Sequence, residues 1–287
     1  MDSTWINAPA KINIGLDVLR RREDGYHEVK MVMQSIRLFD RLTLTKTSRP
    51  GIHLTTNLHF LPVNEDNLVY QSTKLLMEEF KIKDGLKIHL EKRIPVAAGL
   101  AGGSTDAASC MLAINRLFGL GLNKRQLMER GIRLGADIPY CIQKGTALSE
   151  GIGEKLSRAP RMPDCYILIA KPGIHVSTKF VYGSLVLDEN TRHPDIDRML
   201  EAMRENNLNL LCSLMGNVLE TVTVPAHPEI AHIKECMREN GAIGSLMSGS
   251  GPTVFGVFDD LEKAKYAKEC CRMLPYHCFV FVTDLYR

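Results

Sequence analysis

The stretch that decides the fold is Ile94-Pro95-Val96-Ala97-Ala98-Gly99-Leu100-Ala101-Gly102-Gly103-Ser104-Thr105-Asp106. Before it, residues 86–92 alternate apolar and polar side chains, and this period of two predicts a β-strand. After it, apolar residues within 107–118 recur at helical spacing, and Ser104 or Thr105 is a natural N-cap for the predicted helix. We therefore expect a strand, a glycine-rich loop and a helix in this order.

A loop of this kind can bind phosphate. Small residues let a phosphate group approach the backbone, and the N-terminus of the following helix presents free N–H groups and the positive end of a dipole. The stretch alone leaves open a second reading, a tight loop that only allows strand and helix to pack. Neither the Walker A pattern nor Gly-x-Gly-x-x-Gly is present, so the loop predicts neither a P-loop NTPase nor a dinucleotide fold or protein kinase.

The bulk composition is that of a globular protein. The chain has 287 residues, of which 45% are hydrophobic and 24% charged, enough for one large domain or two modest ones. A formal net charge of +3 gives no argument for a nucleic acid partner, whereas an anionic small molecule remains open. No stretch is long and apolar enough to cross a membrane, so we expect no membrane partner.

Cysteine usage and the first residues both predict a cytoplasmic location. Met1-Asp2-Ser3-Thr4-Trp5 shows no basic segment followed by an apolar run, so we expect no signal peptide. No Cys-x-x-Cys pair and no zinc-ligand spacing with histidine is present, so we expect reduced, mostly buried thiols. The eight cysteines stand at positions 110, 141, 165, 212, 236, 270, 271 and 278.

Strands and helices follow one another without a regular βαβ alternation, which predicts an α+β fold. Residues 4–60 predict strands, with a turn at Asp24-Gly25. Glycine and proline cluster within 151–163, where we expect a boundary between domains of residues 1–155 and 156–287. Further helices are expected at 67–80, 124–134, two or three between 178 and 222, 230–239 and after a capping box of Asp259 with Glu262; further strands are expected at 165–171, 242–247, 253–258 and 280–282.

Four further motifs could carry chemistry, although each also has a plain structural reading. They are Asn7-Ala8-Pro9-Ala10-Lys11-Ile12-Asn13, Asp24-Gly25-Tyr26-His27, Gly135-Ala136-Asp137-Ile138-Pro139 and Gly244-Ser245-Leu246-Met247-Ser248-Gly249-Ser250-Gly251-Pro252. Taken singly, Lys11 is a strand lysine that reaches the surface, Asp24-Gly25 is a hairpin turn and Asp137 is a helix cap. The last motif is a flexible turn, and it lacks the Gly-x-Ser-x-Gly of a hydrolase.

Together the motifs resemble those of the GHMP kinases, a family that includes galactose, homoserine, mevalonate and phosphomevalonate kinases. Pro-Ala-Lys-Ile-Asn near the start, Pro95–Ser104 and Gly-Ser-x-x-Ser-Gly-Ser-Gly-Pro near the end match the three family motifs in order. Gly-Ala-Asp-Ile-Pro matches the segment that carries the catalytic aspartate of the family. The resemblance covers nearly the whole chain and implies a two-domain GHMP kinase fold. It would have an N-terminal domain like domain 2 of ribosomal protein S5 and a C-terminal ferredoxin-like domain.

Asp-Gly-Tyr-His narrows the resemblance to one branch of the family, because the dipeptide Tyr26-His27 is absent from the other GHMP kinases. That branch acts on a small-molecule substrate, cytidine diphosphate methylerythritol, in the non-mevalonate isoprenoid pathway. The resemblance implies that the γ-phosphoryl group of ATP is transferred to the 2-hydroxyl of the methylerythritol unit. It leaves open whether the protein is a monomer or a homodimer.

The resemblance also implies roles for single residues. Lys11 would offset charge on the transferring group, and Asp137 would accept the proton of the substrate hydroxyl. Asn13 lies two positions from Lys11 along a strand and therefore shares its face. The dipeptide Tyr26-His27 would hold the cytosine, with Tyr182 against the other face of the base. Mg²⁺ is expected with ATP, and no protein ligand can be named for it.

The ATP phosphates would be bound by the glycine-rich loop. Alanine replaces the glycine of the most glycine-rich family members at 97, 98 and 101, so the remaining glycines carry more weight. The residues expected at this site are Pro95, Val96, Ala97, Ala98, Gly99, Leu100, Ala101, Gly102, Gly103, Ser104 and Thr105.

Two rival readings remain from the sequence. The nearer one is a GHMP kinase for homoserine, mevalonate or a sugar, which Asp-Gly-Tyr-His argues against. The other is a module that binds RNA without catalysis, which requires a basic face with interleaved aromatic residues. The small net charge and the presence of both Lys11 and Asp137 argue against it.

Overall fold

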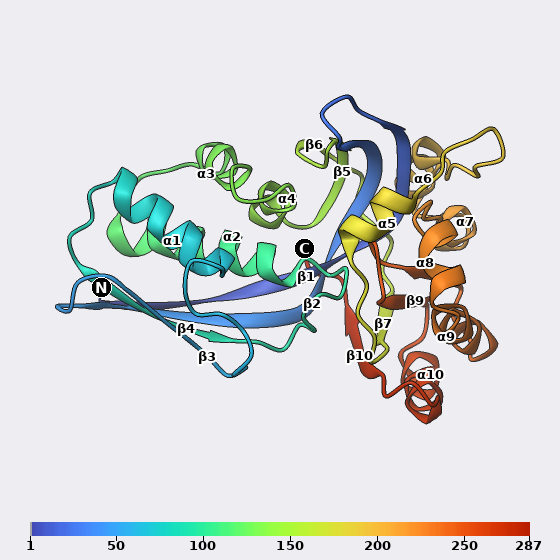
Figure 1. Cartoon of the computed structure of the whole chain (residues 1–287). Coiled ribbons are helices and arrows are strands. Elements are labelled where there is room, and N and C mark those ends of the chain that lie inside the picture. Colours follow the sequence, from blue (N-terminus) through green and yellow to red (C-terminus); the bar gives the residue numbers. More distant parts are fainter. Residues whose placement is uncertain (1) are drawn as a thin grey trace. The chain divides into compact units, whose positions relative to one another are not determined.

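The protein is described over residues 2–287 by a computed structural model (Figure 1). The chain forms two compact units that interleave along the sequence. The first unit comprises the residues up to Ala10, Leu38–Val96 and Ala101–Gln143; the second comprises Lys11–Arg37, Ala97–Leu100 and Lys144–Arg287. Two long strands, β1 (Ser3–Arg21) and β2 (His27–Thr47), contribute residues to both units. The expected boundary at residue 155 stays a prediction.

In the first unit, helices cover a small sheet. Strand β4 (Gly85–Glu91) lies between β3 (Ile52–Thr56), to which it is parallel, and the C-terminal part of β2, to which it is antiparallel. Alternate residues of this sheet form a buried apolar face, because neighbouring side chains on a strand point to opposite sides. They include Leu42, Leu44, Leu86, Ile88 and Leu90. Figure 1 shows helices α1 (Leu68–Glu79) and α2 (Gly102–Phe118) over one face of the sheet.

The starts of the helices in this unit follow two different patterns. Asn67 caps α1 by accepting from the N–H of Val69. Helix α2 instead begins at Gly102, directly after Ala101 in the left-handed region at φ 55°, and no side chain caps it. The expected N-cap at residues 104 or 105 was therefore wrong, because the turn at Ala101 places both residues already inside the helix. Helix α3 (Lys124–Gly131) ends before the predicted residue 134, and α4 (Ile138–Gln143) follows.

The second unit contains a ferredoxin-like sheet. Its antiparallel strands lie in the order β10 (Phe279–Asp284), β7 (Tyr166–Lys171), β9 (Val254–Phe258) and β8 (Gly244–Met247). Helix α9 (Glu229–Glu239) precedes β8 and α10 (Leu261–Met273) precedes β10, which is the order of a β-α-β-β-α-β fold. Helix α10 is capped by Asp260, which accepts from the N–H of Lys263, so the capping box expected at Asp259 was wrong by one position.

The second unit also contains two short strands, which pair with each other and through one of them with β2, and four short helices. Strand β5 (Thr146–Gly151) pairs with Val29–Gln34 of β2 and with β6 (Lys155–Arg158). Four helices fill the segment for which two or three were expected: α5 (Thr178–Ser184), α6 (Ile196–Arg204), α7 (Leu208–Leu214) and α8 (Glu220–Ala226). The predicted α+β class is confirmed by this mixture of helices and sheets.

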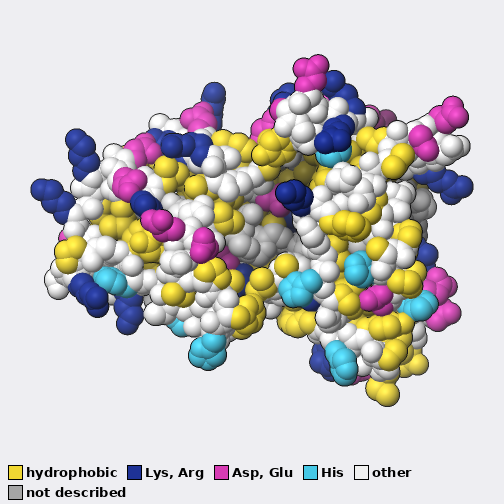
Figure 2. Space-filling view, viewed as in Figure 1, with side chains coloured by type: hydrophobic (Ala, Val, Ile, Leu, Met, Phe, Trp, Pro, Cys, Tyr) yellow, Lys and Arg dark blue, Asp and Glu magenta, His cyan; other side chains and the backbone are white. Residues whose placement is uncertain are grey.

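Most of the cysteine thiols are buried, as the sequence analysis predicted. Five of the eight cysteines are buried and the other three are partly exposed. Burial raises the pKa of the thiols of Cys110, Cys165 and Cys212 to about 12, so these three are protonated at neutral pH. Over residues 2–287, no helix combines the length and the hydropathy needed to cross a bilayer. Figure 2 shows one face on which Lys and Arg are interspersed with Asp and Glu rather than gathered in one patch.

Candidate active site

The glycine-rich loop between β4 and α2 contains three residues in the left-handed region. They are Ala97 at φ 51°, Gly99 at φ 72° and Ala101 at φ 55°. For an alanine this conformation costs roughly 1–2 kcal/mol, and such strain is typical of functional loops. At Gly99 a side chain is excluded altogether, since a Cβ atom there would lie 2.2 Å from the carbonyl oxygen of Ser248. The alanines at 97 and 101 therefore adopt the glycine-like backbone that the loop requires.

In the second unit, Ser248 lies in residues 244–252, which match the third motif of the family and are called the third motif. Its hydrogen bonds join this motif to the glycine-rich loop and to the first motif on β1. Its hydroxyl donates to the carbonyl oxygen of Gly99 at 3.0 Å and accepts from the backbone N–H of Asn13 at 3.3 Å. Gly249 follows at φ 59°, where a Cβ would lie 3.4 Å from the same carbonyl oxygen. The third motif is thus not a flexible turn but a tight loop packed on the glycine-rich loop and on β1.

Lys11 and Asn13 lie side by side on β1, as their spacing predicted. The ammonium of Lys11 donates to the side-chain oxygen of Asn13 at 2.6 Å, and both residues are buried. The backbone N–H of Lys11 donates to the carbonyl oxygen of Leu100 at 3.1 Å. The alternative reading of Lys11 as a surface lysine is therefore excluded.

Asn217 supports the third motif and was missed by the sequence analysis. Its amide donates to the carbonyl oxygens of Met247 at 2.9 Å and Gly249 at 2.8 Å, while its oxygen accepts from the N–H of Leu219. Asn217 is buried before α8 and lies in no pattern that signals a contact with a loop 30 residues later. Only the tertiary structure could reveal it.

Aromatic side chains from distant segments meet near the hairpin that joins β1 and β2. The ring centroids of His27 and Tyr182 lie 5.2 Å apart, with 41° between the ring planes. Thr178, one turn before Tyr182 on α5, shares a hydrogen bond of 2.8 Å with the hydroxyl of Ser250 in the third motif. Burial, together with the charge of Arg21, lowers the pKa of His27, so its imidazole is neutral at pH 7.

Tyr26 precedes this pair in the hairpin turn. Asp24 accepts from the backbone N–H of Tyr26 at 3.1 Å and pairs with Arg22, which fixes the turn. The side chain of Tyr26 is 61% exposed. A planar ring held at the surface by a rigid turn is available for stacking on a ligand.

Asp137 lies directly before α4 in the first unit, with its side chain partly exposed. Its carbonyl oxygen accepts from the N–H of Cys141 and closes the first turn of that helix. Because its side chain is partly exposed, Asp137 can be reached from solvent, and its catalytic role stays a prediction.

Two models of the GHMP kinase family match the chain. That of the GHMP kinases N terminal domain matches residues 67–145, and that of the GHMP kinases C terminal domain matches residues 189–273. The chain belongs to the GHMP kinase family. The resemblance of the motifs is thereby confirmed, and with it the predicted kinase and transferase activity.

Individual GHMP kinases are similar over the full length. Proteins named 4-diphosphocytidyl-2-C-methyl-D-erythritol kinase from Lachnospira eligens and Lachnoclostridium phytofermentans are 54% and 52% identical over 286 residues, which is 100% of this chain and 99% and 98% of theirs. A crystal structure of 4-(cytidine 5′-diphospho)-2C-methyl-D-erythritol kinase aligns with TM-score 0.85 and 32% identity, covering 99% of this chain and 100% of that one. The homoserine kinase of Cytophaga hutchinsonii shares the fold, with TM-score 0.83 and 21% identity, covering 99% and 95%.

GHMP kinases use ATP, and the start of α2 fits its phosphates. The helix has 17 residues and lacks a side-chain cap, so the N–H groups of its first turn are available to an anion. In contrast, among residues 2–287 no group of three or more His, Cys, Asp or Glu side chains is arranged to hold a metal ion.

Proposed function

We propose that this GHMP kinase transfers the γ-phosphoryl group of ATP to the 2-hydroxyl of 4-diphosphocytidyl-2-C-methyl-D-erythritol, giving the 2-phosphate and ADP. This reaction would serve the synthesis of isoprenoid precursors by the non-mevalonate route. The observation that carries the proposal is the contact between the rings of His27 and Tyr182. The family resemblance implies a contact with cytosine for each of these two residues. The proposal is supported by the 54% and 52% identity to kinases that carry this name.

The glycine-rich loop would bind the phosphates of ATP. Residues 95–105 provide the small side chains and the uncapped start of α2, and the dipole of this helix favours negative charge. Mg²⁺ would accompany ATP, with its shell supplied mainly by phosphate oxygens and water, because hard cations prefer such ligands. It would neutralise charge on the phosphates, while the protein residues position the reactants.

Lys11 and Asp137 would act on the transferring group. Phosphoryl transfer requires positioning and charge stabilisation more than covalent catalysis. The ammonium of Lys11 would offset negative charge on the γ-phosphate, and its hydrogen bond to Asn13 fixes its direction. The carboxylate of Asp137 would accept the proton of the substrate hydroxyl as that oxygen attacks phosphorus. A positioned base of this kind contributes about 10²- to 10⁴-fold in rate.

The acceptor would be held by its cytosine. Tyr26 is exposed on a rigid turn and would stack on the base, while His27 would form hydrogen bonds to its edge with Tyr182 alongside. Asn13 would contact the acceptor from the same strand as Lys11. The protein would work in the cytoplasm, as a monomer or a homodimer, with domains of residues 1–155 and 156–287.

An ADP-release assay tests the proposal. Cytidine diphosphate methylerythritol should release ADP in proportion to the 2-phosphate formed, whereas homoserine, mevalonate and galactose should give only background turnover. Mass spectrometry and phosphorus NMR of the product identify the hydroxyl that is modified. A preference for one of the other acceptors would return the protein to the wider GHMP family with another substrate.

A further inference from the structure

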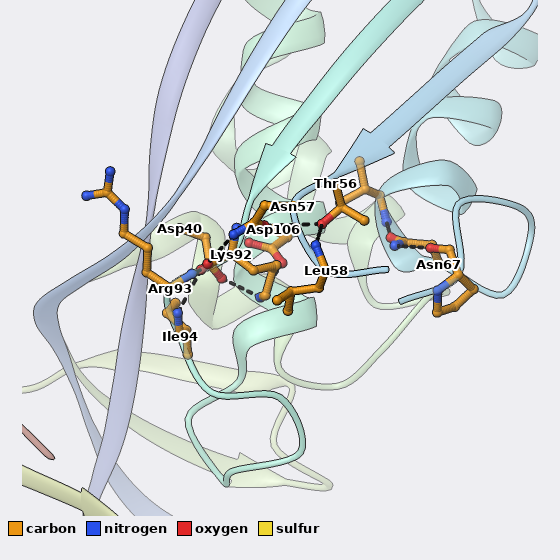
Figure 3. Close-up of polar contacts among 11 residues, drawn as sticks. Asp40, Thr56, Asn57, Leu58, Asn67, Lys92, Arg93, Ile94 and Asp106 are labelled. Atoms are coloured by element: carbon orange, nitrogen blue, oxygen red, sulfur yellow. Dashed lines mark hydrogen bonds and ion pairs between the residues drawn. The ribbon is translucent and has the colours of Figure 1, made fainter. Parts of the chain in front are cut away.

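The chain between β4 and the glycine-rich loop is held by side chains rather than by the sheet (Figure 3). The amide of Asn57 pairs with both backbone groups of Lys92: it accepts from the N–H at 2.8 Å and donates to the carbonyl oxygen at 3.0 Å. The carboxylate of Asp40 accepts from the backbone N–H groups of Arg93 and Ile94, the latter at 2.8 Å. The backbone that enters the loop is thus fixed by hydrogen bonds to side chains.

The side chain of Lys92 extends this anchoring to α2. Its ammonium forms ion pairs with Asp40 on β2 and with Asp106 on α2, the second at 2.7 Å. All three residues are buried, with exposed fractions of 0% for Asp40, 2% for Asp106 and 7% for Lys92. Burial lowers the pKa of Lys92, but the two carboxylates raise it further, so that it lies above its ordinary value and the ammonium stays charged.

Gly102, the first residue of α2, lies against this ammonium. A Cβ atom at Gly102 would be 3.1 Å from the Lys92 nitrogen and 3.3 Å from a methyl group of Ile94. A Cβ at Gly103 would meet only a methyl group of Leu68, at an ordinary 3.6 Å. The side chain of Lys92, which precedes the glycine-rich loop, therefore contacts the first residues of α2, which follow the loop.

Stability alone does not account for this cluster. Asp106 keeps one carboxylate oxygen buried without a hydrogen-bond partner within residues 2–287. Burial raises the pKa of Asp106 well above its usual range, although the charge of Lys92 opposes this shift. Apolar side chains of similar volume often stabilise a core as well as a buried ion pair or better. A cluster that carries such a cost points to a geometric requirement of the loop.

We propose that Asp40, Lys92 and Asp106 are positioning residues for ATP: they fix both ends of the phosphate-binding loop so that the N–H groups at the start of α2 stay at the spacing of the phosphates. The proposal rests on the ATP-binding role of this loop. It requires no contact between the three side chains and the nucleotide. They would act on the loop through the backbone of residues 92–94 and through the position of the Lys92 ammonium next to Gly102.

A double variant, compared with a variant that only lowers stability, separates positioning from stability. Lys92→Met with Asp106→Leu replaces one ion pair by apolar groups of similar size but leaves the buried Asp40 without its cation, so the midpoint of thermal unfolding should fall. Affinity of the folded variant for a non-hydrolysable ATP analogue, measured by calorimetry, should fall roughly tenfold or more, because small displacements of a binding group are costly. The KM of the acceptor should stay unchanged.

Single variants and a control keep the test decisive if the double variant does not fold. Asp106→Asn retains an oxygen for Lys92 and should lose less nucleotide affinity than Asp106→Ala. Arg130→Met removes an ion pair with Glu79 on α1, elsewhere in the same unit, and should lower stability without changing nucleotide affinity. Wild-type affinity in the double variant, or equal affinity of the two Asp106 variants, overturns the inference.

The outcome does not depend on the identity of the acceptor. Analogue binding is measured without any acceptor, so a protein that binds ATP but does not phosphorylate cytidine diphosphate methylerythritol contradicts only the proposed function. If turnover of this acceptor is observed and nucleotide affinity is insensitive to the cluster, the proposed function stands and the positioning role is rejected.

Discussion

The hydroxyl of Ser248 donates a hydrogen bond to the carbonyl oxygen of Gly99, 149 positions earlier in the chain, at 3.0 Å. The same hydroxyl accepts from the backbone of Asn13, so one serine joins three segments that carry the family motifs. A carbonyl that is held in this way cannot rotate freely. The third motif therefore acts on the shape of the glycine-rich loop through the side chain of Ser248.

The close approach of these loops predicts that Gly99→Ala is unusually costly. Gly121 provides a matched control, since its φ of 73° equals the 72° of Gly99 within a degree and no atom lies within 4 Å of its Cβ position. Gly121→Ala should lower the free energy of unfolding by about 1–2 kcal/mol through backbone strain. Gly99→Ala should cost more, and it should weaken ATP binding as well, because the new Cβ collides with the carbonyl of Ser248. Denaturant titrations that give equal losses would contradict this reading.

Gly102→Val should weaken binding of an ATP analogue much more than binding of the acceptor. Gly102 does not have a positive φ, so strain is not the reason; its Cβ would press on the ammonium of Lys92. The loss should therefore be less than additive with that of Lys92→Met. We expect a coupling of about 0.5–3 kcal/mol in a double-mutant cycle of nucleotide affinities. Strict additivity would show that the two residues act separately.

Asp137→Asn should preserve the fold and ATP affinity and lose most of kcat. The amide keeps the size of the side chain and removes its basicity, so a base role predicts a fall of about 10²- to 10⁴-fold. Single-turnover kinetics with saturating ATP measure the chemical step directly. A fall smaller than about tenfold would exclude Asp137 as the base.

The sequence predicted those features that depend on local patterns. The alternation within β4 and the apolar spacing of α1 and α2 each reflect interactions between near neighbours. The motifs were recognised because phosphate binding requires small residues at short spacing. The start of α2 was misplaced because the left-handed turn at Ala101 has no glycine to signal it.

Contacts between distant segments could not be predicted in the same way. Asp106 ends the quoted stretch and Lys92 lies two residues before its start, but their partner Asp40 comes from β2, more than fifty positions before Lys92. Asn217 supports the third motif from a segment without any pattern of its own. Such residues are recognised only when the folded chain shows which polar groups are buried and which partners they have.

The buried carboxylate of Asp106 predicts a pH dependence of stability. Because burial raises the pKa of Asp106 in the folded protein, the folded state binds this proton more tightly than the unfolded state. The contribution is fully present below the ordinary pKa of about 3.9 and is lost as pH rises through the raised value. Relative to the wild type, Asp106→Asn should therefore gain stability as pH increases from about 4 towards neutrality. Parallel curves of unfolding free energy against pH would contradict the shift.

The cytosine of the acceptor should determine which substrate is used. Stacking on Tyr26 tolerates any base and should contribute about 1–3 kcal/mol. Discrimination must therefore come from hydrogen bonds: cytosine offers an amino donor and an N3 acceptor, whereas uracil reverses both. A site built for one pattern leaves groups unpaired with the other, which can cost factors of about 10⁴. The uridine analogue should accordingly be a very poor acceptor, chiefly in kcat/KM.

His27 is the residue we expect to make this distinction, because its lowered pKa keeps the imidazole neutral and able both to donate and to accept. His27→Ala should lower kcat/KM for the cytidine acceptor and reduce its preference over the uridine acceptor. Tyr26→Ala should instead weaken the binding of both acceptors to a similar extent. As pH falls and His27 gains a proton, the wild type should lose kcat/KM for the cytidine acceptor, and His27→Ala should lack this loss. Since a protonated ring can only donate, the loss should appear in the KM of the acceptor and not in that of ATP. Equal kcat/KM for the two acceptors in the wild type would show that the base does not determine the substrate specificity of this enzyme.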